Sequence, residues 1–216
     1  MSESTPEAFA ALLTELAPEF SLALADGEVQ GLAAFLSELT SWNRTTNLFG
    51  RLTPVELARH ALESAAGSVF LEPGDRIVDI GSGGGFPGIP LAIRGHDVIL
   101  LEPRERRAAF LRHLLRKTIP GLKASVLVDR VEKLSPLGFD AATVRAVGGL
   151  GELIGRGDFL REEGKLVIWT TDPEGQAAAL GTAFRWERES SIPGSFQRKI
   201  TLFRKCSTGN VHHSHG

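Results

Sequence analysis

The chain has almost no cysteine. Its 216 residues contain a single one, Cys206, which excludes an internal disulfide and any zinc site of the usual Cys spacing. Residues 1–17 are acidic and alanine-rich, unlike a signal peptide, and no uncharged apolar run approaches the roughly 18 residues of a membrane span. We therefore expect a cytoplasmic protein with no membrane partner and no metal, including at the histidines of the C-terminal tail.

The chain also lacks an excess of charge of either sign. Lysine and arginine number 24 against 26 acidic residues, and the formal net charge is −2. Bulk charge therefore does not indicate a nucleic-acid partner, and any basic surface must be local. A chain of this length can bury a large core without disulfides, as one globular domain with a small appendage.

The hydrophobic pattern changes along the chain. Up to about residue 70 the apolar residues recur at helical spacing, and from residue 74 short apolar or β-branched runs alternate with helical segments. The expected helices are 5–17, 26–43, 53–70, 86–94, 104–119, 149–161 and 173–184. The expected strands are 75–81, 96–103, 124–130, 139–146, 164–170, 184–190 and 196–205.

This alternation predicts an α/β fold with a mostly parallel sheet covered on both faces. The last two strands have no helix between them and predict an antiparallel hairpin at the sheet edge. We expect a helical extension over 1–70, a Rossmann-like domain over 71–206 and a disordered tail over 207–216.

A glycine-rich loop follows the first predicted strand in the stretch "RIVDIGSGGGFPGIPLA", residues 76–92. Gly81, Gly83 and their neighbours can take positive φ and let a ligand lie against bare backbone. Ligands of open α/β sheets bind at the carboxyl ends of the strands. A plain tight turn is the alternative, but it needs fewer glycines.

Two ligand classes compete for this loop. A dinucleotide site requires G-x-G-x-x-G, and here Phe86 occupies the third glycine position. Asp79, before the loop, would repel a pyrophosphate and attract an ammonium group. Glu102 ends the second strand about 20 residues after Gly81, where an acid accepts hydrogen bonds from ribose hydroxyls. S-adenosylmethionine fits these residues better, and a dinucleotide remains the alternative.

The loop resembles the D-x-G-[ST]-G-x-G-[FL]-P-G-[IL]-P-L motif of the RsmG (GidB) family of bacterial small-subunit rRNA methyltransferases. The Phe-Pro-Gly-Ile-Pro segment at 86–90 is its specific part. Further motifs follow in the family's order: "WNRTTNL" (42–48), "RHALES" (59–64), "EPRERRAAFLRHL" (102–114), "DRVEKL" (129–134), "VRAV" (144–147) and "SFQRKITLFRK" (195–205).

The resemblance implies a Rossmann-like class I S-adenosylmethionine-dependent methyltransferase with an N-terminal helical extension. It implies methylation of N7 of one guanine in the decoding-region loop of 16S rRNA, in the small subunit or its precursor, by a monomer. The alternatives are a methyltransferase for another RNA site or a small molecule, and a non-catalytic binding module.

The resemblance also implies roles for individual residues. It places cofactor contacts at Gly81 and Phe86 in the loop and at the acid Glu102 after the second strand. Val131 and Glu132 would flank the adenine. Arg145 would lie beside both the cofactor and the incoming base. Candidate RNA contacts are Arg44, Arg59, His60, Arg112 and Arg198. The alternative for Arg112 is an ordinary solvated position on a helix face. The alternative for His60 is a structural contact between the helical extension and the loop.

Guanine N7 carries a lone pair and no proton, so its methylation needs no general base and can rest on orientation. The sequence agrees, because it lacks S-x-x-K, G-x-S-x-G and Pro-Pro-Tyr motifs and has no cysteine suited to a pyrimidine adduct. Three positions depart from the family: Glu63 and Glu102 replace aspartates, and "VIWTTDPEG" lacks the usual Lys-Gly after the fifth strand.

Overall fold

The structure is a computed structural model that describes residues 4–46, 48–134, 138–145, 149, 151, 154–155 and 157–207. Of the predicted tail, only Ser207 belongs to these residues. Residues 150, 152–153 and 156 of the helix predicted at 149–161 also lie outside them.

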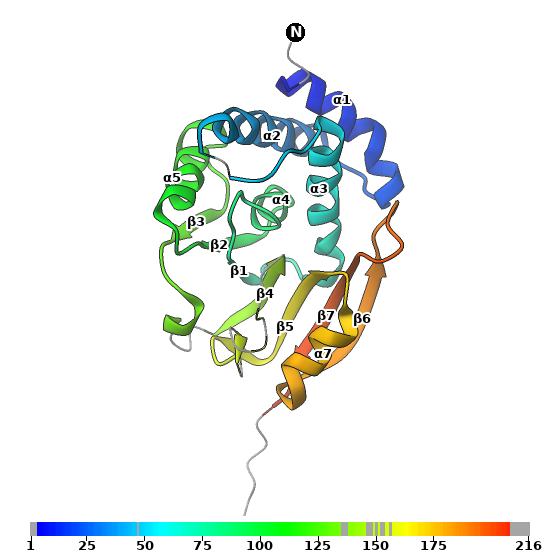
Figure 1. The fold of residues 1–216 in the computed structure, drawn as a ribbon, viewed down its shortest axis with the longest axis vertical. Coiled ribbons are helices and arrows are strands. Elements are labelled where there is room, and N and C mark those ends of the chain that lie inside the picture. Colours follow the sequence, from blue (N-terminus) through cyan, green and yellow to red (C-terminus); the bar gives the residue numbers. More distant parts are fainter. Residues whose placement is uncertain are drawn as a thin grey trace, which may run out of the picture.

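A seven-stranded sheet crosses the molecule (Figure 1), in the order β3-β2-β1-β4-β5-β7-β6. The strands are β1 (Arg76–Ile80), β2 (Asp97–Leu101), β3 (Ala124–Leu127), β4 (Phe139–Arg145), β5 (Leu160–Thr170), β6 (Phe184–Ser191) and β7 (Lys199–Lys205). The first five pair in parallel, and β7 inserts antiparallel between β5 and β6. The predicted parallel sheet with a terminal antiparallel hairpin is confirmed.

Successive residues of a strand point to opposite faces of the sheet, and the apolar residues of the central strands divide accordingly. Ile77 of β1 and Val167 of β5 belong to a core on one face. Their neighbours Val78 and Ile168 belong to a second core on the other face. Both faces are therefore buried, as expected for a parallel sheet.

The N-terminal helices lie on one side of the sheet (Figure 1), and their buried residues pack against one of its faces. They are α1 (Pro6–Leu16), α2 (Asp26–Thr46) and α3 (Pro54–Ala66), with the short turns η1 (Ala17–Phe20) and η2 (Gly67–Phe70). Thr53 caps α3 in a reciprocal capping box with Glu56. Buried residues of all three helices share one apolar cluster with the sheet, so the division after residue 70 stays a prediction.

The remaining helices connect the strands. They are α4 (Gly88–Ile93), α5 (Glu105–His113) and α7 (Pro173–Leu180), with the short turns η3 (Leu114–Thr118), η4 (Val131–Lys133) and η5 (Gly181–Ala183). The α4 helix packs against both α2 and α3. The glycine loop therefore lies between the sheet and the N-terminal helices.

The prediction for the fifth strand was wrong at its start. β5 begins at Leu160, where the sequence predicted a helix reaching 161 and a strand only from 164. Leu160 pairs with Phe139, but the register shifts before Lys165 pairs with Ala141. The intervening Glu163 has a positive φ of 57°. This irregularity turns charged residues to solvent and hides the strand pattern.

The helices predicted over 104–119 and 173–184 also end earlier, at His113 and Leu180, and are followed by a π-helical turn and a 3₁₀ turn. Among the described residues, no helix is both long and apolar enough to cross a membrane.

Candidate functional site

The glycine loop connects the end of β1 to α4. Gly81 and Gly83 take backbone φ values of 73° and 54°, which residues with a Cβ rarely adopt. The backbone N–H groups of Gly81 and Ser82 donate to the carbonyl of Leu101, at 2.8 and 3.1 Å. The loop is therefore fixed to the end of β2 and keeps its bare backbone toward the carboxyl ends of the strands.

Asp79 lies beneath this loop. Its side chain is fully buried, and its carboxylate accepts from the N–H of Gly88 at 3.2 Å and from the hydroxyl of Thr143 at 2.8 Å. Burial raises the pKa of Asp79 to about 6, against hydrogen bonds from Ser82, Thr143 and Gly88 that lower it. The carboxylate of Asp79 faces the protein and holds the start of α4. This geometry therefore does not favour the predicted contact between Asp79 and a ligand ammonium group.

Glu102 follows β2 and is almost fully buried. One carboxylate oxygen accepts from the N–H of Gly83 at 2.9 Å and the other from the N–H of Arg104 at 2.8 Å. Each oxygen still has a lone pair for a ligand hydroxyl. Glu102 therefore both fixes the loop and presents acceptors to the space beside it.

Two adjoining cavities open at the carboxyl ends of β1, β2 and β3, and both are lined by Gly81 and Pro103. The larger, of about 580 Å³, is also lined by Gly83, Phe86, Glu102 and Arg145. The smaller, of about 200 Å³, is lined by Ile80, Leu101, Val131 and Glu132 among others. An apolar slot beside a buried acid and a bare backbone suits a nucleoside with a short polar extension, so these residues fit S-adenosylmethionine.

The structure thus brings seven of the eight predicted cofactor residues to the walls of these two cavities. They are Gly81, Gly83, Phe86, Glu102, Val131, Glu132 and Arg145. Asp79 is the exception, because it lies under the loop.

Arg145, the last residue of β4, reaches α3 across the end of the sheet. Its guanidinium donates to a carboxylate oxygen of Glu63 at 3.0 Å and to the hydroxyl of Ser64 at 3.1 Å. It also contacts Nδ1 of His60 and lies over the ring of Phe86, with 5.8 Å between Cζ and the ring centroid. These contacts fix the Arg145 side chain between α3 and the glycine loop.

Glu63 is the centre of this group. Its side chain is 1% exposed, and its other carboxylate oxygen lies 2.7 Å from a guanidinium nitrogen of Arg198. Burial acts to raise the pKa of Glu63, but the hydrogen bond with His60 and the charges of Arg145 and Arg198 outweigh it and lower the pKa. Burial lowers the pKa of Arg145, against the charge of Glu63.

A third cavity, of about 330 Å³, opens beside this group at the carboxyl ends of β4 and β5. Arg145 lines both this cavity and the larger cofactor cavity. Thr170 and Thr171, at the end of β5 and just after it, also line it, together with Arg198, which directly precedes β7. The arginines of this cavity therefore come from the end of β4 and from the residue before β7, whereas the end of β5 contributes neutral side chains.

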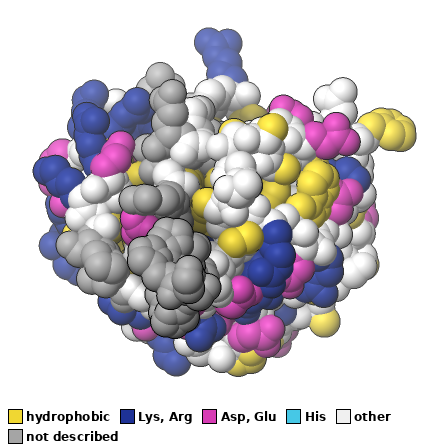
Figure 2. Space-filling view, turned by 90° about the horizontal axis from the view of Figure 1, so that it is seen from below, with side chains coloured by type: hydrophobic (Ala, Val, Ile, Leu, Met, Phe, Trp, Pro, Cys, Tyr) yellow, Lys and Arg dark blue, Asp and Glu magenta, His cyan; other side chains and the backbone are white. Residues whose placement is uncertain are grey.

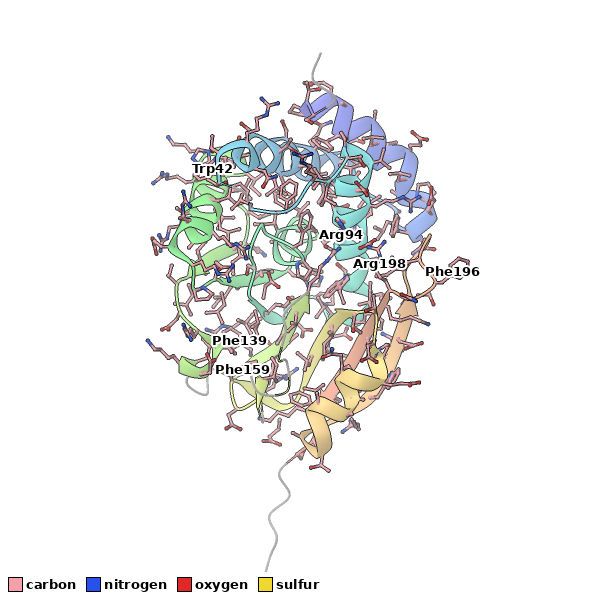
Figure 3. The ribbon with its side chains drawn as sticks, in the orientation of Figure 1. Trp42, Arg94, Phe139, Phe159, Phe196 and Arg198 are labelled. Atoms are coloured by element: carbon pink, nitrogen blue, oxygen red, sulfur yellow. The ribbon has the colours of Figure 1, made fainter. Side chains whose placement is uncertain are left out.

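The candidate RNA contacts separate in space. His60 and Arg198 line the third cavity with Arg145, and Figure 3 shows Arg198 between α3 and the terminal hairpin. Arg44 is exposed at the end of α2. Arg59 pairs with Glu19 at 2.6 Å, and Arg112 pairs with Glu105 at 2.6 Å. These last three do not line the third cavity.

The face opposite the N-terminal helices is mixed in charge. Figure 2 shows Lys and Arg side chains interspersed with Asp and Glu there. In the described part of this face, the side chains do not form a surface of one sign.

The sequence did not identify three residues of the site. Glu63 stands out only as a glutamate in place of the family's aspartate, Trp169 only as part of "VIWTTDPEG", and Gln176 belongs to no motif. Trp169 donates to the carbonyl of Glu63 at 2.9 Å and joins β5 to α3. Gln176 of α7 lines the third cavity. No local signal finds such residues, because their partners are distant in sequence.

The sheet order with a reversed last strand, and the glycine loop after its first strand, define a Rossmann-like methyltransferase. A solved structure of magnesium protoporphyrin IX methyltransferase from Synechocystis PCC 6803 with bound S-adenosylmethionine shares this fold. Its TM-score is 0.58 at 16% identity, covering 86% of this chain and all of that one. A mutant of MtNAS solved with S-adenosylmethionine gives a TM-score of 0.55 at 19% identity, covering 93% and 74%.

The model of the family described as rRNA small subunit methyltransferase G matches residues 28–187. The ribosomal RNA small subunit methyltransferase G of Gluconobacter oxydans (strain 621H) is 32% identical over 185 residues, covering 81% of this chain and 93% of that relative. The protein of the same name from Pseudomonas aeruginosa (strain UCBPP-PA14) is 32% identical over 200 residues, covering 88% and 92%. The chain belongs to the rRNA small subunit methyltransferase G family, and the resemblance drawn from its sequence is confirmed.

Proposed function

We propose that this protein transfers the methyl group of S-adenosylmethionine to N7 of a guanine in the decoding-region loop of 16S rRNA. The observation that carries the proposal is Arg145, which lines both the cofactor cavity and the cavity at the ends of β4 and β5. A base bound in the cavity at the ends of β4 and β5 would lie next to a methyl donor bound in the larger cavity beside the glycine loop.

The residues that would hold S-adenosylmethionine are those of the two cavities. Glu102 would accept from the ribose hydroxyls, Gly81 and Gly83 would border the methionine end, and Val131 and Glu132 would flank the adenine. When bound, the cofactor supplies an electrophilic methyl group on a sulfonium.

The protein's own contribution is orientation. N7 needs no base to remove a proton, so the residues around it must hold the guanine in line with the methyl group and exclude water. A guanidinium bonded to N7 would block the attack, whereas one bonded to the neighbouring O6 leaves N7 free. Arg145 is suited to O6 because Glu63, Ser64 and His60 fix its side chain.

The substrate would be the small ribosomal subunit or its precursor, met in the cytoplasm by a monomer. The N-terminal extension, residues 1–70, carries Arg44 and Arg59 and would contact phosphates together with Arg112, while Arg198 would contact the RNA from the cavity at the ends of β4 and β5. The part from 71 to 206 would form the methyltransferase domain. Phosphate contacts of this kind position the RNA without reading its sequence.

The test uses small subunits from cells lacking their native enzyme. They are incubated with the purified protein and radiolabelled S-adenosylmethionine, and modified guanines are mapped by borohydride–aniline cleavage. We expect a single cleavage in the decoding-region loop, lost in Glu102→Ala. In Arg145→Ala we expect strongly reduced methylation together with weaker cofactor binding by calorimetry, because Arg145 lines both cavities. Cofactor binding without any RNA labelling by the wild type would overturn the proposal.

A further inference from the structure

Gln176 lines the cavity at the ends of β4 and β5 and carries an unused hydrogen-bond acceptor. The side-chain oxygen Oε1 of Gln176 is buried and has no hydrogen-bond partner among the described residues. A buried acceptor without a donor is costly, so a ligand that supplies a donor is favoured there. Arg145 and Arg198 line the same cavity and can only donate. Its other polar lining residues include His60, Glu63, Thr170 and Thr171.

Gln176 is held in place by the structure of the β5–α7 connection. Asp172 caps α7 by accepting from the N–H of Gly175 at 2.9 Å, and its own N–H donates to the hydroxyl of Thr170 at 2.9 Å. The N–H of Gln176 donates to the carbonyl of Asp172 at 3.1 Å. The first turn of α7 is therefore fixed against the end of β5, which lines the same cavity.

Guanine matches the two guanidinium donors and the Gln176 acceptor. Guanine offers the acceptors O6 and N7 on one edge and the donors N1–H and N2–H on its Watson–Crick edge. When N7 faces the cofactor cavity, the Watson–Crick edge points away from it. We propose that the cavity at the ends of β4 and β5 binds the unstacked target guanine, and that Gln176 selects it by accepting from N1–H and N2–H.

The same arrangement disfavours adenine. Adenine would place an amino group where the guanidinium groups need an acceptor, and its bare N1 would face the oxygen of Gln176. A site whose buried polar groups are left unpaired rejects the wrong ligand strongly. Gln176 is therefore a specificity-determining residue, and this inference rests on the proposed function.

The test compares small subunits assembled with guanine or inosine at the target position, since inosine lacks only the N2 amino group. Single-turnover methylation is measured for the wild type, Gln176→Leu and Gln176→Glu, with Gln30→Leu as a matched control on an exposed position of α2. We expect Gln176→Leu to lower kcat/KM for guanine roughly 10- to 100-fold. We expect it also to lose the wild type's preference for guanine over inosine, while cofactor binding and the melting temperature stay at wild-type values.

The conservative variant keeps an acceptor, so Gln176→Glu should retain the preference for guanine over inosine, and Gln30→Leu should behave as wild type. An equal guanine-to-inosine ratio in the wild type and Gln176→Leu would overturn the assignment of this cavity while leaving the proposed function intact. If the wild type labels no RNA at all, the proposed function itself fails.

Discussion

The carboxylate of Glu63 and the guanidinium of Arg145 meet at 3.0 Å inside the protein, one from α3 and the other from the end of β4. Arg198, the residue before β7, binds the same carboxylate at 2.7 Å. One buried acid thus holds two arginines of the site in place and joins the N-terminal helices to the sheet.

Replacing Glu63 by alanine should therefore affect both stability and activity. Removal of a buried carboxylate leaves two guanidinium groups without their counter-charge, at a cost of about 3–5 kcal/mol. The measurement is the free energy of unfolding in urea, together with kcat for methyl transfer. Glu105→Ala breaks the exposed pair with Arg112 and should change stability by less than about 1 kcal/mol. Equal costs for the two variants would contradict the central role of Glu63.

Asp79 should make stability depend on pH. The folded-state pKa of Asp79 is about 6, above the ordinary value of 3.8. Between about pH 4 and pH 6 the folded protein therefore keeps a proton that the unfolded chain has already released. Stability falls as pH rises through about 4 to 6, and it is lower above pH 6 than below pH 4 by about 3 kcal/mol from this group.

The check on this prediction is a series of urea titrations from pH 4 to pH 7 on the wild type and Asp79→Asn. The asparagine cannot ionise, so the stability of the wild type relative to the variant should decrease with rising pH over this range. A stability difference between the two proteins that does not change with pH would rule out a buried carboxyl with a raised pKa at this position.

Gly88 should tolerate no side chain. A Cβ there would lie 2.6 Å from an oxygen of Asp79 and 2.4 Å from Leu100, and both neighbours are buried. We expect Gly88→Ala to cost about 1–3 kcal/mol of stability by overpacking and to weaken cofactor binding by displacing the loop. Calorimetry and urea unfolding measure the two effects.

Gly27 provides the matched control for Gly88, because it also lies in the first turn of a helix and a Cβ there meets nothing within 4 Å. Gly27→Ala should leave cofactor binding unchanged and stability equal or slightly higher. If Gly88→Ala keeps the same stability and cofactor affinity as Gly27→Ala, then α4 does not pack closely on Asp79.

Glu102→Gln should weaken cofactor binding at least tenfold. The two carboxylate oxygens accept from the backbone N–H groups of Gly83 and Arg104, and an amide can offer only one oxygen to these two donors. The other donor then faces an NH₂ group, and the loop shifts. Calorimetric titration with S-adenosylmethionine gives the affinity, with the exposed Glu15→Gln as the control that should bind as the wild type does.

The sequence alone determined the sheet, the loop and most of the residues that line the two cavities beside the loop. These features depend on short-range patterns: strand periodicity, the glycines after β1, and an acid at the end of β2. Local patterns predict local structure, and parallel strands bring their carboxyl ends to one edge whatever the details of packing. The start of β5 was missed because an irregular charged segment interrupts its pattern.

Only the tertiary structure decided the role of Asp79 and the arrangement around Glu63. Asp79 looked like a ligand contact, but the chain returns at Gly88 and Thr143 and encloses its carboxylate. Glu63, Arg145 and Arg198 come from three distant segments, and Gln176 from a fourth. No spacing in the sequence brings these side chains together, because it is the crossing of the strands and the packing of α3 that makes them neighbours.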